Sequence, residues 1–222
     1  MKSTKTGQVV RILGTYPSLT TLPVHPLSTT YKSDNLKWVE TLTSSHQEIA
    51  NEVSKVIDSI PPTEFQTFNT PLGSSYSTST GWSHIPLLTH FHPSPTSSSY
   101  FPHLSSLLTS TATPSRLGPR HVAVAVQEPG KGIDLHSDLI NTHLTLHLPL
   151  SGCTGDSGMA VNGIEHRWRD GIPKVFDTTF EHRTFNEGEG NSRVLLVDFW
   201  HPDLGVEERE AMRIFWNYNS GV

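Results

Sequence analysis

The chain has 222 residues, of which 34% are hydrophobic and 17% charged, and both fractions lie below those typical of globular proteins. Ser, Thr, Pro and Gly make up the difference, which excludes a coiled coil or a helical bundle and favours a strand-rich, loop-rich protein. The net charge is −5 and no block of Lys or Arg occurs, so we expect no nucleic-acid partner.

The sequence also limits where the protein works and what chemistry it carries. No run approaches eighteen consecutive apolar residues and the first ten residues lack an apolar stretch, so we expect neither a membrane span nor a signal peptide. Cys153 is the only cysteine, which excludes intrachain disulfides and sulfur-rich metal sites and favours a reducing, cytoplasmic location. Thirteen histidines direct attention to metal binding and acid–base chemistry.

The first half of the chain predicts an arm, a helix and a polar segment. Residues 1–33 alternate short β-prone runs with prolines, as an extended arm would. Apolar residues then recur at helical spacing over 34–60, until Pro61-Pro62 stops the helix. In residues 61–115, 23 of 55 are Ser or Thr and Glu64 is the only charged residue. This composition suits a disordered linker, but seven aromatic residues favour an ordered strand-and-loop segment with a short helix in 100–110.

The second half predicts a sheet protein. Five or six strands within about 80 residues, without a helical pattern between them, indicate an antiparallel sandwich or barrel. The candidate strands are His121–Gln127, Leu139–Leu150, Gly158–Val161, Glu165–Trp168, Lys174–Asp177 and Ser192–Trp200. A closing helix is expected over Val206–Tyr218. We interpret 1–222 as a single domain, with flanking segments over 1–117, a core over 118–204 and a C-terminal helix over 205–222.

The sharpest chemical signal is His136-Ser137-Asp138. Residues two apart on an extended segment point to the same side, so both side chains can reach one ion. His182 follows later, and two imidazoles with one carboxylate form a set that holds Fe(II) with positions left open. In a histidine-rich chain, the alternative is that these are surface or core histidines without a metal.

Two neighbouring patterns bear on this interpretation. Arg193 begins an apolar strand and could clamp a carboxylate with its planar guanidinium, or could instead be a rim residue paired with Asp198 or Glu189. His143, Thr145 and His147 share one face of their strand, which we expect to lie nearest the metal; ordinary strand histidines are the alternative.

Residues from about 81 to 204 resemble the aspartyl/asparaginyl β-hydroxylase family of Fe(II)- and 2-oxoglutarate-dependent oxygenases. The resemblance is carried by Glu128-Pro129-Gly130, the spacing from His136 to His147-Leu148, Asn162-Gly163, Trp168-Arg-Asp-Gly171, Val175-Phe-Asp-Thr-Thr-Phe-Glu-His182 and Leu196-Val-Asp-Phe-Trp-His-Pro-Asp-Leu204.

This resemblance implies a mostly β double-stranded β-helix (jelly roll, cupin-like) with a few flanking helices. It implies that His136 and His182 bind Fe(II), that Arg193 holds the distal carboxylate of 2-oxoglutarate and that His147 contacts this cosubstrate. Three positions differ from the family pattern: Asp138 replaces a glycine, Thr145 replaces an arginine near the cosubstrate, and Ala125 replaces a serine. We expect Asp138 to be the third ligand; a turn-capping, solvent-facing Asp138 is the alternative.

The expected function is oxidation of a C–H bond of a small molecule, using Fe(II), 2-oxoglutarate and O2. Residues 61–115 are neutral and rich in aromatic side chains and would suit a roof over an uncharged substrate, or would merely cover a sheet edge. Two other functions stay open: hydroxylation of aspartyl or asparaginyl residues in a protein or peptide, and an inactive jelly-roll binding module. The pattern does not predict the oligomeric state.

Overall fold

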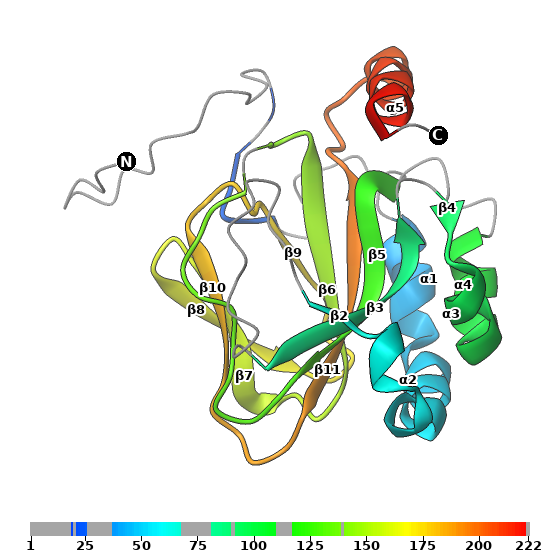
Figure 1. Cartoon of the computed structure of the whole chain (residues 1–222). Helices are drawn as coiled ribbons and strands as arrows, with labels where there is room; N and C mark the ends of the chain where they lie inside the picture. The colour runs from blue at the N-terminus through cyan, green and yellow to red at the C-terminus, as the bar shows by residue number, and fades with distance from the viewer. Residues whose placement is uncertain are drawn as a thin grey trace.

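The structure is a computed structural model, and it describes residues 19, 21–25, 37–67, 81–89, 92–109, 117–138 and 140–220. Two antiparallel sheets face each other, and helices cover the outer side of the larger sheet (Figure 1). The predicted mostly β fold, a double-stranded β-helix (jelly roll) with flanking helices, is confirmed. Among the described helices, none combines the length and the apolar character that a membrane span requires.

The larger sheet has the strand order β1-β9-β6-β11-β5-β3-β2, with β4 paired to β3. Its strands are β1 (Val24–His25), β2 (Gln66–Thr67), β3 (Trp82–Thr89), β4 (His92–Pro93), β5 (Leu117–Gln127), β6 (His143–Ser151), β9 (Lys174–Phe176) and β11 (Ser192–Trp200). The central strands β6, β11 and β5 are apolar on one face, with Leu146, Leu195 and Val124 fully buried there. This face packs against the helices and forms the main core.

The helices that cover the outer face of the large sheet are α1 (Lys37–Ser44), α2 (His46–Val56), η2 (Ile57–Ser59), α3 (Pro95–Tyr100) and α4 (Pro102–Thr109). A short turn of helix, η3 (Pro62–Glu64), follows η2, and α5 (Val206–Ser220) lies apart from this layer, at one end of the molecule (Figure 1). The single helix predicted over 34–60 is broken at Ser45 between α1 and α2. Thr43 and Ser44 donate their hydroxyls to the carbonyls of Val39 and Thr41, and such local bonds compete with continuation of a helix.

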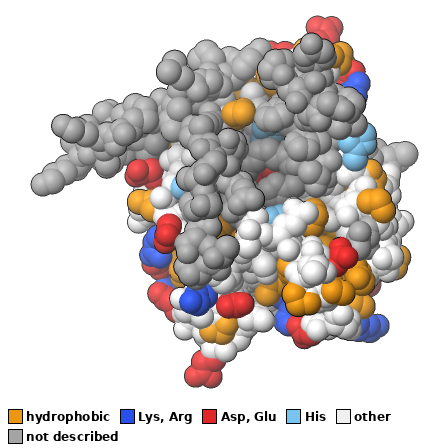
Figure 2. Space-filling view, viewed as in Figure 1, with side chains coloured by type: hydrophobic (Ala, Val, Ile, Leu, Met, Phe, Trp, Pro, Cys, Tyr) orange, Lys and Arg blue, Asp and Glu red, His pale blue; other side chains and the backbone are white. Residues whose placement is uncertain are grey.

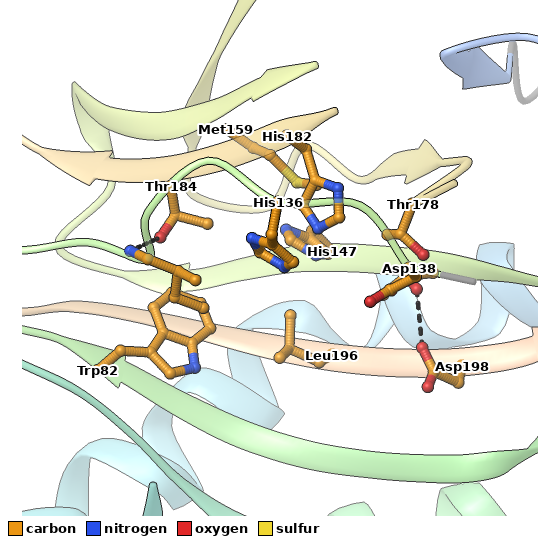
Figure 3. Close-up of a pocket in the computed structure, with 12 residues that line it drawn as sticks. Trp82, His136, Asp138, His147, Met159, Thr178, His182, Thr184, Leu196 and Asp198 are labelled. Carbon is orange, nitrogen blue, oxygen red and sulfur yellow. Dashed lines mark hydrogen bonds between the residues drawn. The ribbon is translucent and has the colours of Figure 1, made fainter. Parts of the chain in front are cut away.

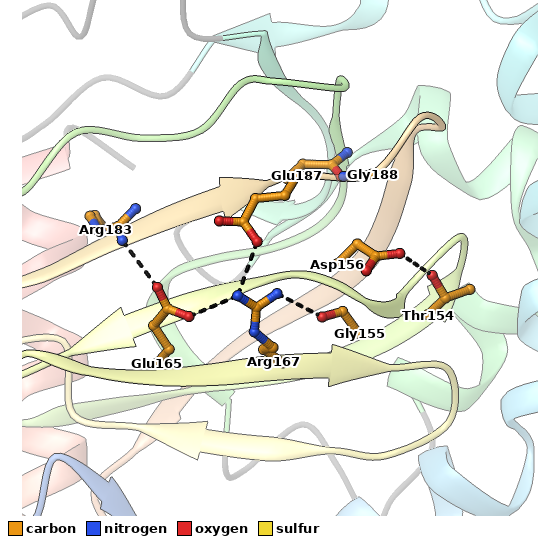
Figure 4. A network of polar contacts seen from close by, with 9 residues as sticks. Thr154, Gly155, Asp156, Glu165, Arg167, Arg183, Glu187 and Gly188 are labelled. Atoms are coloured by element: carbon orange, nitrogen blue, oxygen red, sulfur yellow. Dashed lines mark hydrogen bonds and ion pairs between the residues drawn. The ribbon is translucent and has the colours of Figure 1, made fainter.

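The smaller sheet has the order β10-β7-β8, from β7 (Thr154–Val161), β8 (Ile164–Arg169) and β10 (His182–Asn186). Its outer face carries ion pairs: Arg167 lies 3.0 Å from both Glu165 and Glu187, and Arg183 lies 3.4 Å from Glu165 (Figure 4). Because side chains alternate along a strand, Trp168 points inward, where it is fully buried in a second apolar cluster between the sheets.

The strand predictions hold with two corrections. The strand expected from Leu139 begins only at His143, since Asn141 and Thr142 form a turn; Leu139 itself lies outside the described residues. Strand β10 was not predicted. Within its described part, the segment 61–115 is ordered as predicted: it contributes β3, which pairs with β5, and a short helix, α4, lies within the expected 100–110. The domain boundaries at 117 and 204 stay a prediction.

Figure 2 shows one face of the molecule, on which the described Lys and Arg side chains are scattered and do not gather into a patch.

Candidate metal centre

A pocket lies between the two sheets and encloses about 450 Å³, part of it open to solvent. The larger sheet and the smaller sheet both contribute, together with the segment 131–138 and the loop before β10 (Figure 3). The described residues that line it are Trp82, Ile133, His136, Asp138, Thr145, His147, Met159, Thr178, His182, Thr184, Leu196 and Asp198.

The backbone brings the first and last predicted metal ligands together. His136 and His182 form a two-residue antiparallel bridge, in which the N–H of each donates to the carbonyl of the other at 2.9 and 2.8 Å. Upstream, Ile133 donates to the hydroxyl of Thr184 at 2.8 Å, and so segment 131–138 follows β10 like an added strand. Gly132 permits this approach, because a Cβ there would lie 2.0 Å from the carbonyl oxygen of Thr184.

Each of the two imidazoles is oriented by a hydrogen bond to the backbone carbonyl two residues before it. Nδ1 of His136 lies 2.7 Å from the carbonyl oxygen of Asp134, and Nδ1 of His182 lies 2.8 Å from that of Phe180. A carbonyl can only accept, so in each ring Nδ1 carries the proton and Nε2 is left with the lone pair that a metal needs. The ring centroids are 4.0 Å apart.

Asp138 completes the set. Its backbone N–H donates to the carbonyl of Thr178 at 2.8 Å, and its side chain is buried, so it does not point to solvent as the turn-capping alternative requires. The potential ligand atoms of His136, Asp138 and His182 all lie within 4.8 Å of one another. Two imidazoles and a carboxylate, gathered around one point at a pocket wall, are a donor set that suits a divalent iron.

His147 and Thr145 lie on β6 with their side chains in the pocket, on the face expected from the sequence. The ring of His147 packs against Trp168 and Phe176, with centroids 5.4 and 5.0 Å away. Burial, with a smaller contribution from His182, lowers the pKa of His147 to about 3, so the ring is neutral at physiological pH. His143, on the same face, lies outside the pocket and stacks on Trp200.

Arg193 does not reach the pocket, which corrects the prediction for its position. Its Nη2 atom lies 3.1 Å from Oδ1 of Asp58, at the helix-covered face of the large sheet. Neither of the partners suggested for a rim arginine, Asp198 or Glu189, is the one observed. Side chains alternate along β11, and Leu196 and Asp198 face the pocket, so Arg193, an odd number of residues away, faces the helices.

Sequence reasoning did not assign a pocket role to Asp198, Trp82, Met159 or the threonines of the opposite wall. Asp198 accepts a hydrogen bond from the Thr145 hydroxyl at 2.7 Å. Its place could have been found from the two-residue alternation of Val194, Leu196 and Asp198, given one residue known to face the pocket. The remaining lining residues come from separate segments and carry no shared local pattern.

The fold is a cupin-like jelly roll, and His136, Asp138 and His182 form a candidate metal site in the pocket between its sheets. The chain matches the family described as aspartyl/asparaginyl β-hydroxylase over residues 43–202, and it belongs to that family.

Curated relatives cover only part of this chain. Aspartate beta-hydroxylase domain-containing protein 2 of Xenopus tropicalis is 33% identical over 95 residues, which are 41% of this chain and 25% of the relative. The aspartyl/asparaginyl beta-hydroxylase of Mus musculus is 25% identical over 95 residues, or 41% of this chain and 12% of the relative. The ornithine lipid ester-linked acyl 2-hydroxylase of Rhizobium tropici is 33% identical over 81 residues, which are 35% of this chain and 28% of the relative. The chain thus matches between about an eighth and a quarter of these proteins.

Among solved structures, a cupin described as a sugar phosphate isomerase from Silicibacter pomeroyi has a TM-score of 0.36 and 15% identity, covering 64% of this chain and 73% of that one. A protein described as a predicted oxalate decarboxylase from Thermotoga maritima has a TM-score of 0.35 and 17% identity, and the match covers 54% of this chain and 80% of that one.

Proposed function

We propose that the protein is a non-haem iron oxygenase that oxidises a C–H bond of a small molecule. The observation that carries this proposal is the convergence of His136, Asp138 and His182 at the wall of a pocket whose other lining is largely apolar or hydroxylic. Membership of a hydroxylase family supports the reaction class. The bound iron would activate O2 so that one oxygen atom enters a C–H bond, while a co-reactant of the 2-oxo acid class would take up the other oxygen atom and supply two electrons as it loses carbon dioxide.

The protein's own residues hold the ligands and select the substrate. Carbonyls of Asp134 and Phe180 fix the two rings, and burial keeps His147 neutral. The apolar side chains of Trp82, Ile133, Met159 and Leu196 exclude water and would orient an uncharged hydrocarbon portion of the substrate.

A small molecule is favoured over a protein substrate by the character of this pocket. An aspartyl substrate carries a negative charge, and the described lining offers no cationic side chain to receive it. The Rhizobium tropici relative is named as an acyl 2-hydroxylase, so at least one relative of this chain is named for a substrate other than an amino-acid residue.

2-Oxoglutarate, the cosubstrate implied by the resemblance, does not fit the residues present. Its expected anchor, Arg193, lies on the other face of the sheet, and the described lining contains neither Lys nor Arg. We therefore derive no step of the reaction through this molecule.

The proposal is tested by incubating the Fe(II)-loaded protein with O2, a panel of 2-oxo acids and mixed apolar small molecules, and searching for products that have gained one oxygen atom. The expected result is a product that forms with wild type and not with His182→Ala. Identical products from both proteins would contradict the proposal. Oxidation confined to Asp- or Asn-containing peptides would favour the peptide hydroxylase instead.

A further inference from the structure

The charges that line the pocket are unusual for a site expected to bind a dicarboxylate. Among its described lining residues, Asp138 and Asp198 are acidic, three are histidines, and none is Lys or Arg. Lys131 and Arg183 belong to neighbouring segments, but neither lines the pocket, and Arg183 pairs with Glu165 on the outer face.

The inner face of β11 beyond Leu196 carries no cation among the described residues. Next to Leu196 on this face come Val194 and Ser192, both buried. The hydroxyl of Ser192 donates to that of Ser157 at 2.7 Å. On the adjacent strand β5, Ala125 lies opposite Val194 and Gln127 opposite Ser192. The described residues at this end are thus apolar or neutral, and Arg193 between them faces away.

The character of the described lining discriminates between possible ligands. A 2-oxo acid with an uncharged tail would place that tail against the apolar side chains of the pocket. 2-Oxoglutarate would place its second carboxylate among the same side chains, where a charge without a partner is costly.

We infer that the molecule sharing the metal in this pocket is a chelating 2-oxo acid with an uncharged tail, and that the pocket discriminates against 2-oxoglutarate. This inference rests on the metal site of the proposed function. The orientation of Arg193 sets the discrimination, because its guanidinium pairs with Asp58 and does not line the pocket. Asp198 adds an acidic side chain to the lining, where it accepts a hydrogen bond from Thr145.

The test compares 2-oxoglutarate with 2-oxopentanoate, which has the same carbon chain and a methyl group in place of the distal carboxylate. Each acid is titrated anaerobically into the Fe(II)-loaded protein, following the visible charge-transfer band and, as an independent readout, the tryptophan fluorescence, to which Trp82 of the pocket lining contributes. We expect 2-oxopentanoate to bind at least tenfold more tightly.

Two variants sharpen this comparison. Asp198→Asn replaces an acidic side chain of the lining with a neutral one of the same shape. It should lower the dissociation constant of 2-oxoglutarate at least threefold and change that of 2-oxopentanoate less. Arg193→Ala is the matched control on the same strand, and should leave both dissociation constants within twofold of wild type because its side chain faces Asp58.

The outcomes separate the inference from the proposed function. Tighter binding of 2-oxoglutarate than of 2-oxopentanoate would overturn the inference, as would a tenfold loss of 2-oxoglutarate binding in Arg193→Ala. Iron binding with no response to either acid would also overturn it, while leaving the metal site in place. A protein that binds no metal would overturn both.

Discussion

Asp138 differs most clearly from the family pattern described above, because its carboxylate stands where that pattern has a glycine. Its buried side chain lies with those of His136 and His182 around one point. A buried carboxylate requires a compensating cation or hydrogen bonds, and a divalent metal supplies the former. The residue therefore distinguishes a three-ligand centre from a two-histidine one.

Asp138→Ala should lower the affinity for Fe(II) or Co(II) at least tenfold, because one of three protein ligands is lost while the two rings keep their carbonyl contacts. Metal titration followed by calorimetry measures this. Asp134→Ala is the matched control: its exposed side chain is removed, but its backbone carbonyl still holds His136, so affinity should stay within twofold. Unchanged affinity in Asp138→Gly would assign the protein a two-histidine site.

At the scale of elements, the site depends on the close approach of segment 131–138 to β10. Gly132→Ala should displace this segment, since the added methyl group would meet the carbonyl of Thr184 at 2.0 Å. We expect a loss of metal affinity of at least tenfold and a destabilisation of about 1–3 kcal/mol, as in other overpacked sites. Metal titration and urea unfolding measure the two effects. Gly190→Ala, where nothing lies within 4 Å of the added Cβ, should alter neither.

The docking of β1 should depend on pH. Burial, followed by the charge of His201, lowers the pKa of His25 to about 4, although Asp203 opposes this shift. A histidine with a depressed pKa in the folded state contributes stability above its unfolded value near 6.5, and this stability is lost as the pH falls toward 4. Protection of the Asp177 amide, which donates to Pro23 beside β1, should therefore decline between pH 6.5 and 4.

The control for this pH effect is a histidine that is exposed. His25→Leu should weaken the pH dependence of Asp177 protection, whereas His103→Gln, in the exposed first turn of α4, should leave it unchanged. An identical decline in wild type and His25→Leu would assign the effect to other groups.

The sequence predicted strands better than it predicted the faces of strands. The bounds Ser192–Trp200 are those observed, yet the face of Arg193 was assigned wrongly. Both faces of this strand are buried, and its run Val194-Leu-Leu-Val197 has no polar alternation from which to decide which side meets the pocket. Strand β10 was missed for a related reason: polar residues such as Thr184 and Asn186 face inward toward the site and its supporting turns.

The metal ligands were more predictable than the pocket. His136 and Asp138 share a side by local geometry alone, whereas His182 was proposed only as a histidine farther along the chain, and the family resemblance supported its pairing with them. The rest of the lining comes from several segments of both sheets and the loops between them, and only the three-dimensional fold places these side chains together.

At the scale of the whole molecule, the two faces of the large sheet have different roles: one contributes most to stability and the other to ligand binding. Its outer face packs against the helices, and its inner face forms the pocket. Leu195 and Leu196 are neighbours in β11 that lie on opposite faces, so they test this separation directly.

Leu195→Ala should lower the free energy of unfolding by about 2–5 kcal/mol, because it leaves a cavity in the main core, while metal affinity stays within twofold. Leu196→Ala should instead enlarge the pocket and weaken the binding of an apolar 2-oxo acid severalfold. Urea unfolding and ligand titration on both variants measure the contrast. Equal effects of the two substitutions on ligand binding would show that the faces are coupled.

The bridge between His136 and His182 has a consequence for how tightly a metal is held. The fold has already joined these two chain segments through paired peptide groups, so an ion that links their side chains closes a short ring and does not have to restrict a long loop. Most of the ordering entropy of the chelate is thus supplied during folding. It follows that metal release need not await global unfolding: local fraying of segment 131–138 from β10 is sufficient, and the rate of that fraying sets an upper limit on how long the ion stays bound.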